Sequence, residues 1–137
     1  MGNKELFQKV KELNLPIGEY ALFGSAPMGV RGLRECHDID IIVTEKLWND
    51  YKNKSEWKLI EIREDNNYFE GLRNDDIELW RDWWPGWNVD KLIQEAEIID
   101  GLSFVKLGEV IKWKRFRARE KDLKDVEIIE KFLQTKK

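Results

Sequence analysis

The segment FGSAPMGVRGLRECHDIDIIV, residues 23–43, decides the fold expected for this chain. An apolar run ends in Gly24 and Ser25, and after a spacer of twelve residues Asp38 and Asp40 begin a second apolar run. Side chains two apart in a strand point to the same face, so Asp38 and Asp40 are expected to project side by side. Burying carboxylates is costly, which predicts a partner that neutralises them.

Two adjacent carboxylates suggest a divalent cation. They repel each other, which raises one pKa unless a cation lies between them, and oxygen ligands with open positions suit Mg²⁺ or Mn²⁺. A third acid is expected from the segment DDIELW, residues 75–80, where Glu78 repeats the apolar–acidic–apolar pattern around Asp40. Asp76 shares the expected strand face of Glu78 and is the reserve candidate.

Gly24 and Ser25 suggest a phosphate site. Glycine lets a phosphate approach the backbone, N–H groups at a following helix start favour anions, and the Ser25 hydroxyl can donate to a phosphate oxygen. Arg31 and Arg34 follow and are candidates for contacts with terminal phosphates. The alternative is an ordinary turn and helix cap with solvated arginines.

The rest of the chain predicts an α/β or α+β domain, a mixed sheet with helices on one side. Helices are expected over residues 3–13, after Ser25, over 44–53, near 90–96 and over 107–133 with a break near 118–121, and strands over 19–24, 38–43, 56–62, 68–73 and 75–80, with a short pair around Asp100 and Gly101. The whole chain, 1–137, is expected to be one domain, with a core of about 18–105 and C-terminal helices over about 107–134.

Composition narrows the class of protein. The chain has 137 residues, of which 42% are hydrophobic and 37% charged, a balance typical of soluble globular domains. No apolar run approaches the roughly 20 residues of a membrane span, and the net charge of −3 argues against non-specific coating of nucleic acid. A lone cysteine, Cys36, excludes an internal disulfide. With an N-terminus typical of an amphipathic helix rather than a signal peptide, these features predict a cytoplasmic protein.

Two other segments carry open alternatives. The segment KWKRFRAREK, residues 112–121, holds six cations and is either a triphosphate or RNA surface, or an amphipathic helix with Trp113 and Phe116 inward and solvated charges outward. The second interpretation suits most of these cations, but Arg119 and Lys121 are expected near the phosphates.

The tryptophan-rich segment WRDWWPGW, residues 80–87, has three interpretations. It stacks a base or acceptor, forms a dimer surface, or supplies two of its four indoles to the core. His37 is expected to point to the strand face opposite Asp38 and to be structural.

The stretch LFGS…DIDI resembles the signature of the DNA polymerase β-type nucleotidyltransferase superfamily: an apolar residue, Gly, Gly or Ser, a spacer of about a dozen, then Asp-apolar-Asp-apolar. The resemblance implies a mixed β-sheet flanked by helices in a minimal nucleotidyltransferase domain. It further implies that Gly24 and Ser25 hold the phosphates of a nucleoside triphosphate, and that Asp38, Asp40 and Glu78 bind two Mg²⁺ or Mn²⁺ ions.

The tail adds a looser resemblance. Arg119, Lys121, Asp122 and Asp125 match an Arg-x-Lys-Asp-x-x-Asp segment of small nucleotidyltransferase-like proteins, including the AbiEii-type toxin components. Where those proteins often have Gly and Pro around the arginine, this chain has Ala118 and Glu120.

Three functions follow as hypotheses. The first is Mg²⁺-dependent transfer of a nucleoside monophosphate from an NTP, ATP among them, to a hydroxyl of a small molecule, a protein or an RNA end, with loss of pyrophosphate. The second is an AbiEii-like toxin with an antitoxin-like partner, and the third is a non-catalytic nucleotide- or protein-binding module, with a homodimer open in each case. No residue in the sequence identifies the base or the acceptor.

Overall fold

The computed structural model describes residues 2–64, 66–81 and 87–135. Its described helices are α1 (Asn3–Glu12), α2 (Ala26–Gly29), α3 (Glu45–Tyr51), α4 (Val89–Gln94), α5 (Leu107–Arg117) and α6 (Glu120–Thr135). Its described strands are β1 (Tyr20–Phe23), β2 (Ile39–Val43), β3 (Lys58–Glu64), β4 (Asn67–Asn74), β5 (Ile77–Trp80), β6 (Glu97–Ile99) and β7 (Leu102–Phe104). The elements expected from the sequence are present, with ends that differ by a few residues.

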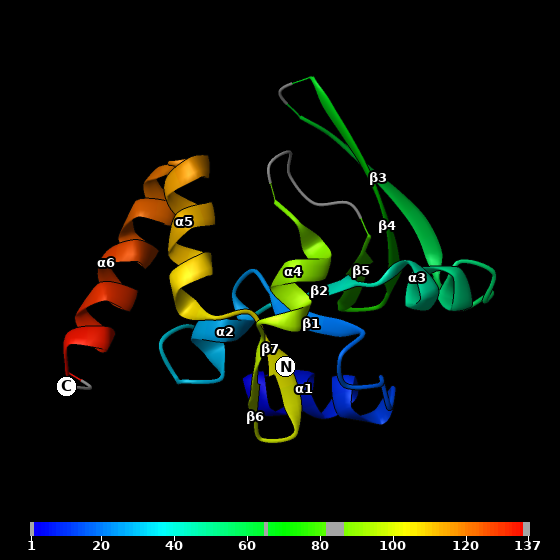
Figure 1. Ribbon diagram of the computed structural model, residues 1–137, viewed down its shortest axis with the longest axis horizontal. Helices are drawn as coiled ribbons and strands as arrows, with labels where there is room; N and C mark the ends of the chain where they lie inside the picture. Colours follow the sequence, from blue (N-terminus) through cyan, green and yellow to red (C-terminus); the bar gives the residue numbers. More distant parts are fainter. Residues whose placement is uncertain (1, 65, 82–86, 136–137) are drawn as a thin grey trace.

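The strands form one mixed sheet in the order β3-β4-β5-β2-β1-β7-β6. Strand β1 pairs antiparallel with the central strand β2 and parallel with β7, and β2 pairs parallel with β5. The β3–β4 hairpin forms one edge and extends beyond the rest of the sheet (Figure 1). Because β1 runs against β2, the end of β1 lies beside the start of β2, and this brings the two halves of the 23–43 segment together.

Helices cover both faces of the sheet, which corrects the expectation of helices on one side. Leu6 of α1 and Leu47 of α3 pack in the core on one face. Leu92 of α4, Val110 of α5 and Ile129 of α6 pack in the core on the other face. The sequence indicates helices on both faces of the sheet, because β1 and most of β2 are apolar at consecutive positions, a pattern typical of strands that are buried on both faces. Both strands are buried in this way in the structure.

Local signals explain where the helices begin and end. The Thr44 side chain accepts a hydrogen bond from the Leu47 backbone N–H at 3.3 Å and caps α3, and Asn88 caps α4 in the same way. Ala118 adopts a left-handed conformation with φ of 52° and ends α5, which confirms the predicted break in the tail. α6 then packs back against α5 (Figure 1).

The aromatic side chains are divided between core and surface. Trp80 is buried, as expected for part of the tryptophan-rich segment, whereas Trp83 and Trp84 lie outside the described residues. Trp87 is partly buried and contacts the Phe116 ring, with 4.9 Å between centroids. The prediction that Phe116 points inward is wrong, because the residue is half exposed.

Among the helices of the described ranges, none combines the length and the apolar character needed to cross a membrane.

Candidate functional site

The sheet register places two of the predicted residues, Asp40 and Glu78, in one row. Asp40 of β2 lies opposite Phe23 of β1 on one side and opposite Glu78 of β5 on the other. Glu78 in turn lies opposite Arg73 of β4. Residues that are direct partners in a sheet project to the same face with their Cβ atoms close together, so Asp40, Glu78 and Arg73 meet on one surface. Asp38, just before β2, joins them through Arg73, since the two side chains form an ion pair.

Gly24 lies against this row. It has a φ of +61°, and a Cβ built on it would come within 2.7 Å of the Asp40 Oδ2 atom. The residue is therefore a glycine for two reasons: the backbone is left-handed and the carboxylate occupies the space of a side chain. Ser25 follows as the N-cap residue of α2, but its side chain does not cap the helix.

The environment of Asp40 favours its protonated form. Burial, together with the charge of Glu78 and a hydrogen bond between the two carboxyl groups, raises the pKa of Asp40 from 3.8 to about 7. The Trp80 indole N–H, 3.4 Å from Asp40 Oδ1, acts in the opposite direction. Near neutral pH the Asp40 carboxyl group therefore ionises less readily than that of an exposed aspartate.

Arg73 supplies positive charge to the carboxylates. Its guanidinium lies 3.0 Å from Glu78 and 3.5 Å from Asp38. Within the described residues, no group of three or more His, Cys, Asp and Glu side chains is arranged to hold a metal ion. The chemistry of the side chains nevertheless suits a metal ion, because Asp38, Asp40 and Glu78 offer carboxylate oxygens, the ligands that Mg²⁺ prefers. One cation, the Arg73 guanidinium, already contacts two of these acids, Asp38 and Glu78.

Two pockets open on the carboxylates and share Asp38, Asp40, Trp113 and Arg119. We call the first the polar pocket. Besides the shared residues it is lined by Gly24, Ser25, Arg34, Glu35, His37, Lys114, Lys121, Asp122 and Asp125. We call the second, of about 260 Å³, the apolar pocket. Besides the shared residues it is lined by Ile62, Glu64, Phe69, Glu78, Trp80 and Arg117. The pair of aspartates therefore lies where a polar compartment meets an aromatic one.

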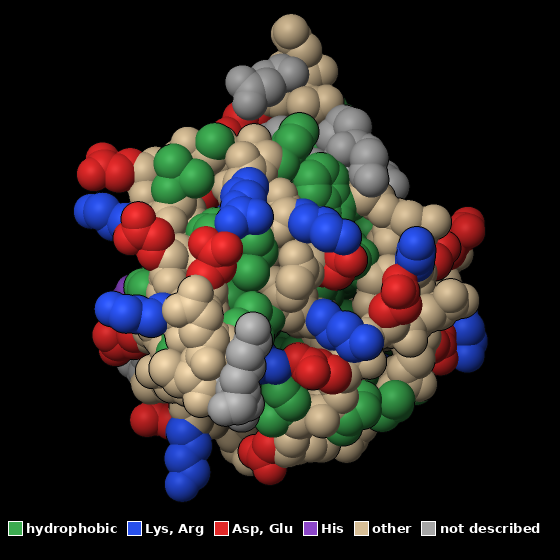
Figure 2. All heavy atoms as spheres, turned by 60° about the vertical axis from the view of Figure 1, so that its left-hand side comes forward, with side chains coloured by type: hydrophobic (Ala, Val, Ile, Leu, Met, Phe, Trp, Pro, Cys, Tyr) green, Lys and Arg blue, Asp and Glu red, His purple; other side chains and the backbone are tan. Residues whose placement is uncertain are grey.

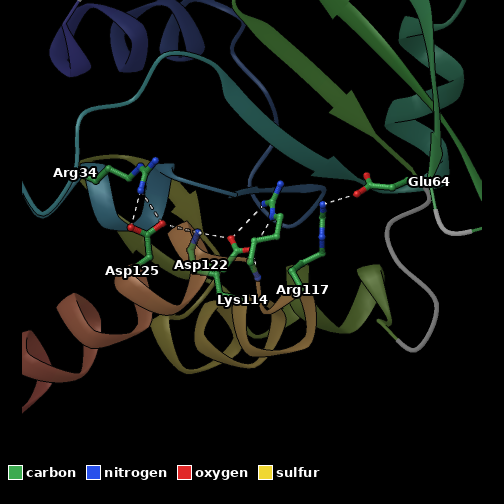
Figure 3. A network of polar contacts seen from close by, with 7 residues as sticks. Arg34, Glu64, Lys114, Arg117, Asp122 and Asp125 are labelled. Carbon is green, nitrogen blue, oxygen red and sulfur yellow. Dashed lines mark hydrogen bonds and ion pairs between the residues drawn. The ribbon is translucent and has the colours of Figure 1, made fainter.

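A chain of ion pairs forms the wall of the polar pocket (Figure 3). The Lys114 ammonium donates to Asp125 at 3.0 Å and lies 3.9 Å from Asp122. Asp125 accepts two hydrogen bonds from Arg34, at 2.6 and 2.7 Å, and Asp122 accepts from Arg119 at 2.7 Å. We call this chain the relay. Lys114 and both aspartates are buried, so the relay fixes one arginine on each side of a buried lysine.

The relay also shifts the pKa of Asp122. Burial alone would raise the pKa of Asp122, but the hydrogen bonds from Arg119 and the charges of Arg119 and Lys114 outweigh it and hold the pKa below its usual value. The relay has three cationic and two anionic members, so it leaves one positive charge beside the polar pocket.

A second ion pair connects the hairpin to the helices. Arg117 at the end of α5 donates to Glu64 at the end of β3 at 2.9 Å, and both residues line the apolar pocket (Figure 3). The contact holds the projecting hairpin against α5 on the side of the molecule where the pocket opens.

The surface around the C-terminal helices carries both signs of charge. Figure 2 shows Lys and Arg side chains interspersed with Asp and Glu side chains, with hydrophobic side chains visible between them. Of the six cations of residues 112–121, four are exposed (Lys112, Arg115, Arg119 and Lys121), Arg117 is partly buried and Lys114 is buried, so most of them lie on a solvated face as predicted.

The structure does not bring every predicted residue to the pockets. Arg31 pairs with Glu97 and donates to the Pro27 carbonyl at 2.7 Å, away from both linings. Asp76, the reserve acid, lies 3.4 Å from Lys9 of α1. The turn before β5 explains this second difference, because strand alternation does not extend back to Asp76.

Three residues of the site were missed or misplaced by sequence reasoning. His37 lines the polar pocket rather than pointing away, since β2 begins only at Ile39 and alternation does not apply before it. Lys114 is buried, contrary to the expectation of a solvated cation, because α6 supplies its acidic partners. Arg73 had no signal in the sequence that separates it from other strand arginines.

Comparison with known families identifies the fold. The family model for the nucleotidyltransferase domain matches residues 3–136. The chain belongs to this nucleotidyltransferase domain family. The match is consistent with a minimal domain of the polymerase β-like superfamily, as the 23–43 segment indicated, and it supports nucleotidyl transfer as the general activity. A comparison with curated proteins gives no match.

Proposed function

We propose that this nucleotidyltransferase-family protein transfers a nucleoside monophosphate from an NTP to a hydroxyl acceptor and releases pyrophosphate, with Mg²⁺ or Mn²⁺ as cofactor. One observation carries the proposal: Gly24 packs directly on Asp40, and Asp40 lies in register with Glu78. The turn at Gly24 and Ser25, which we propose binds phosphate, therefore lies beside the carboxylates at one end of the sheet.

Three side chains would hold the metal. Asp38, Asp40 and Glu78 supply only oxygen ligands. Their negative charges repel one another and attract a divalent cation. When bound, the metal would neutralise phosphate charge and lower the pKa of the acceptor hydroxyl. In the metal-free protein burial and Glu78 raise the pKa of Asp40 to about 7, so metal binding would release a proton from Asp40 near neutral pH.

The polar pocket is the proposed site of the polyphosphate. Gly24 gives backbone access, Ser25 offers a hydroxyl that is not used to cap α2, and Arg119 and Lys121 line the same pocket. The relay holds the guanidinium groups of Arg34 and Arg119 in place before the ligand arrives, which lowers the cost of ordering them on binding. We propose Arg34 rather than Arg31 for the contact, because only Arg34 lines the pocket.

The apolar pocket is proposed to take an organic part of the reactants. Phe69, Trp80 and Trp113 line it beside the carboxylates, and aromatic walls suit a base or the body of an acceptor.

The test is the thermal midpoint of the purified protein with each NTP, with and without Mg²⁺ or Mn²⁺, together with pyrophosphate release. A ligand that binds only the folded state raises the midpoint as its concentration rises. We expect a rise that requires metal and NTP together and that disappears in Asp38→Asn and Asp40→Asn. A rise with NTP that is indifferent to metal and to these substitutions would contradict the proposal and favour a non-catalytic binding module.

A further inference from the structure

Arg73 makes three separate contacts at the carboxylate cluster. Its Nη1 atom lies 3.0 Å from Glu78, its Nη2 atom 3.5 Å from Asp38, and its Nε donates to the Asp75 carbonyl at 3.0 Å. The third contact anchors the guanidinium to the turn between β4 and β5. The other two direct it at two of the three acids proposed as metal ligands.

The register of the sheet sets the position of Arg73 beside the acids. Arg73 and Glu78 are direct partners in the antiparallel β4–β5 pair, and Asp40 is the partner of Glu78 in the parallel β2–β5 pair. Across β4, β5 and β2 the row therefore consists of one cation, Arg73, followed by two acids, Glu78 and Asp40. An arginine keeps its charge at every pH at which the protein folds, so its effect on the acids is permanent.

Without Arg73 the metal-free cluster would be poorly balanced. Asp38 and Glu78 would lose the guanidinium that contacts both of them, and the negative charge of the cluster would have no counter-ion among the contacts that the structure gives these acids. A divalent cation removes the same imbalance. Arg73 and the metal thus perform the same neutralisation on overlapping ligands.

We propose that Arg73 is the built-in counter-ion of the metal-free site and competes with the divalent cation for Asp38 and Glu78. The inference rests on the proposed function, because it takes these acids as metal ligands. Metal binding then requires the guanidinium to give up at least one carboxylate. The Arg73 side chain is 44% exposed, so it has open space into which to withdraw.

The competition has two consequences. Replacement of Arg73 by an uncharged residue should strengthen the binding of a divalent cation, since no internal cation has to be displaced. The same replacement should destabilise the metal-free protein, because the acids lose their partner. A merely structural arginine would give the second effect without the first.

The experiment measures Mn²⁺ affinity without nucleotide, by electron paramagnetic resonance of free Mn²⁺, and the thermal midpoint in EDTA. The variants are Arg73→Gln, which removes the charge at similar length, and Arg73→Lys, which keeps the charge but loses the forked geometry. The matched control is Arg63→Gln, on the same hairpin, whose guanidinium is 3.6 Å from Glu61 and whose side chain is 76% exposed. Circular dichroism confirms that each variant is folded.

We expect Arg73→Gln to bind Mn²⁺ roughly tenfold more tightly, the size of effect that loss of a charged hydrogen-bond partner supports, and to have a lower midpoint in EDTA. Arg73→Lys should fall between it and the wild type, and Arg63→Gln should match the wild type. Equal or weaker Mn²⁺ binding by a folded Arg73→Gln would overturn the inference and leave the proposed function standing. Absence of Mn²⁺ binding to the wild type and to every variant would also overturn the inference, whereas the proposed function fails only if metal and NTP together give no rise in the thermal midpoint.

Discussion

Gly24 lies so close to Asp40 that a Cβ at residue 24 would stand 2.7 Å from the Asp40 Oδ2 atom. Contact at this distance leaves no room for any other side chain. The turn after β1 and the acid on β2 are therefore built as one unit.

The first prediction concerns this contact. Gly24→Ala should destabilise the protein by about 1–3 kcal/mol, because alanine is strained at positive φ and its Cβ displaces the carboxylate. The displacement should also abolish metal-dependent stabilisation by NTP. Urea unfolding and the thermal midpoint with Mg²⁺ and NTP measure the two effects.

Gly32→Ala is the matched control for the Gly24 prediction. Gly32 has a φ of +73°, but a Cβ built on it meets nothing within 4 Å. This variant carries the backbone strain alone and should keep its response to metal and NTP. If the two variants responded alike, the approach of Gly24 to Asp40 would have no functional meaning.

The sequence predicted Gly24 and Asp40 as candidate site residues because the pattern that marks each of them is local in the chain. The apolar–acidic–apolar pattern of Ile39, Asp40 and Ile41 predicts a strand and the face of Asp40 without knowledge of the partner strand. The turn after an apolar run is equally local. The caps at Thr44 and Asn88 and the break at Ala118 were predictable for the same reason.

Arg73 and Lys114 could not be predicted because their partners are non-local. Arg73 meets Asp38 only through the register of three strands, and Lys114 meets its acids only once α6 has packed on α5. A single sequence shows neither register nor helix packing. Their hydrophilic side chains resemble those of ordinary surface residues, and burial of Lys114 contradicts the usual preference of lysine.

The second prediction tests the relay. Lys114→Met keeps the length and volume of the side chain but leaves Asp122 and Asp125 buried with less positive charge. Removing one partner of a buried ion pair costs about 3–5 kcal/mol, and we expect a loss of this size in urea unfolding at neutral pH. Lys112→Met, on the same helix with a side chain that is 69% exposed, should change stability by less than about 0.5 kcal/mol. Similar losses in both variants would refute the structural role of the relay.

The third prediction concerns pH. Asp40 has a pKa of 3.8 when unperturbed and about 7 in the folded, metal-free protein, so between these values the folded state holds a proton that the unfolded chain has released. Its contribution to the free energy of unfolding is therefore greatest below pH 4, falls as pH rises, and levels off above pH 7.

Asp40→Asn isolates this contribution, because asparagine does not titrate. In EDTA, the wild type should lose up to about 4 kcal/mol relative to the variant between pH 4 and pH 8, since one pKa unit corresponds to about 1.4 kcal/mol. Parallel stability curves for the two proteins over this range would show that Asp40 ionises normally.

The fourth prediction separates the two arginines that follow the turn proposed to bind phosphate. Arg34 lines the polar pocket and is held by Asp125 at 2.6 Å, whereas Arg31 is paired with Glu97 and lies outside the pocket lining. Arg34→Met should weaken metal-dependent NTP binding roughly tenfold or more, because it removes a charged donor to phosphate. Arg31→Met should leave NTP affinity within about twofold of the wild type and lower only the thermal midpoint, since it breaks a contact between the turn after α2 and Glu97 of β6. Titration of each variant with NTP and Mg²⁺ by calorimetry measures the affinities, and a larger loss in Arg31→Met than in Arg34→Met would move the polyphosphate away from the polar pocket.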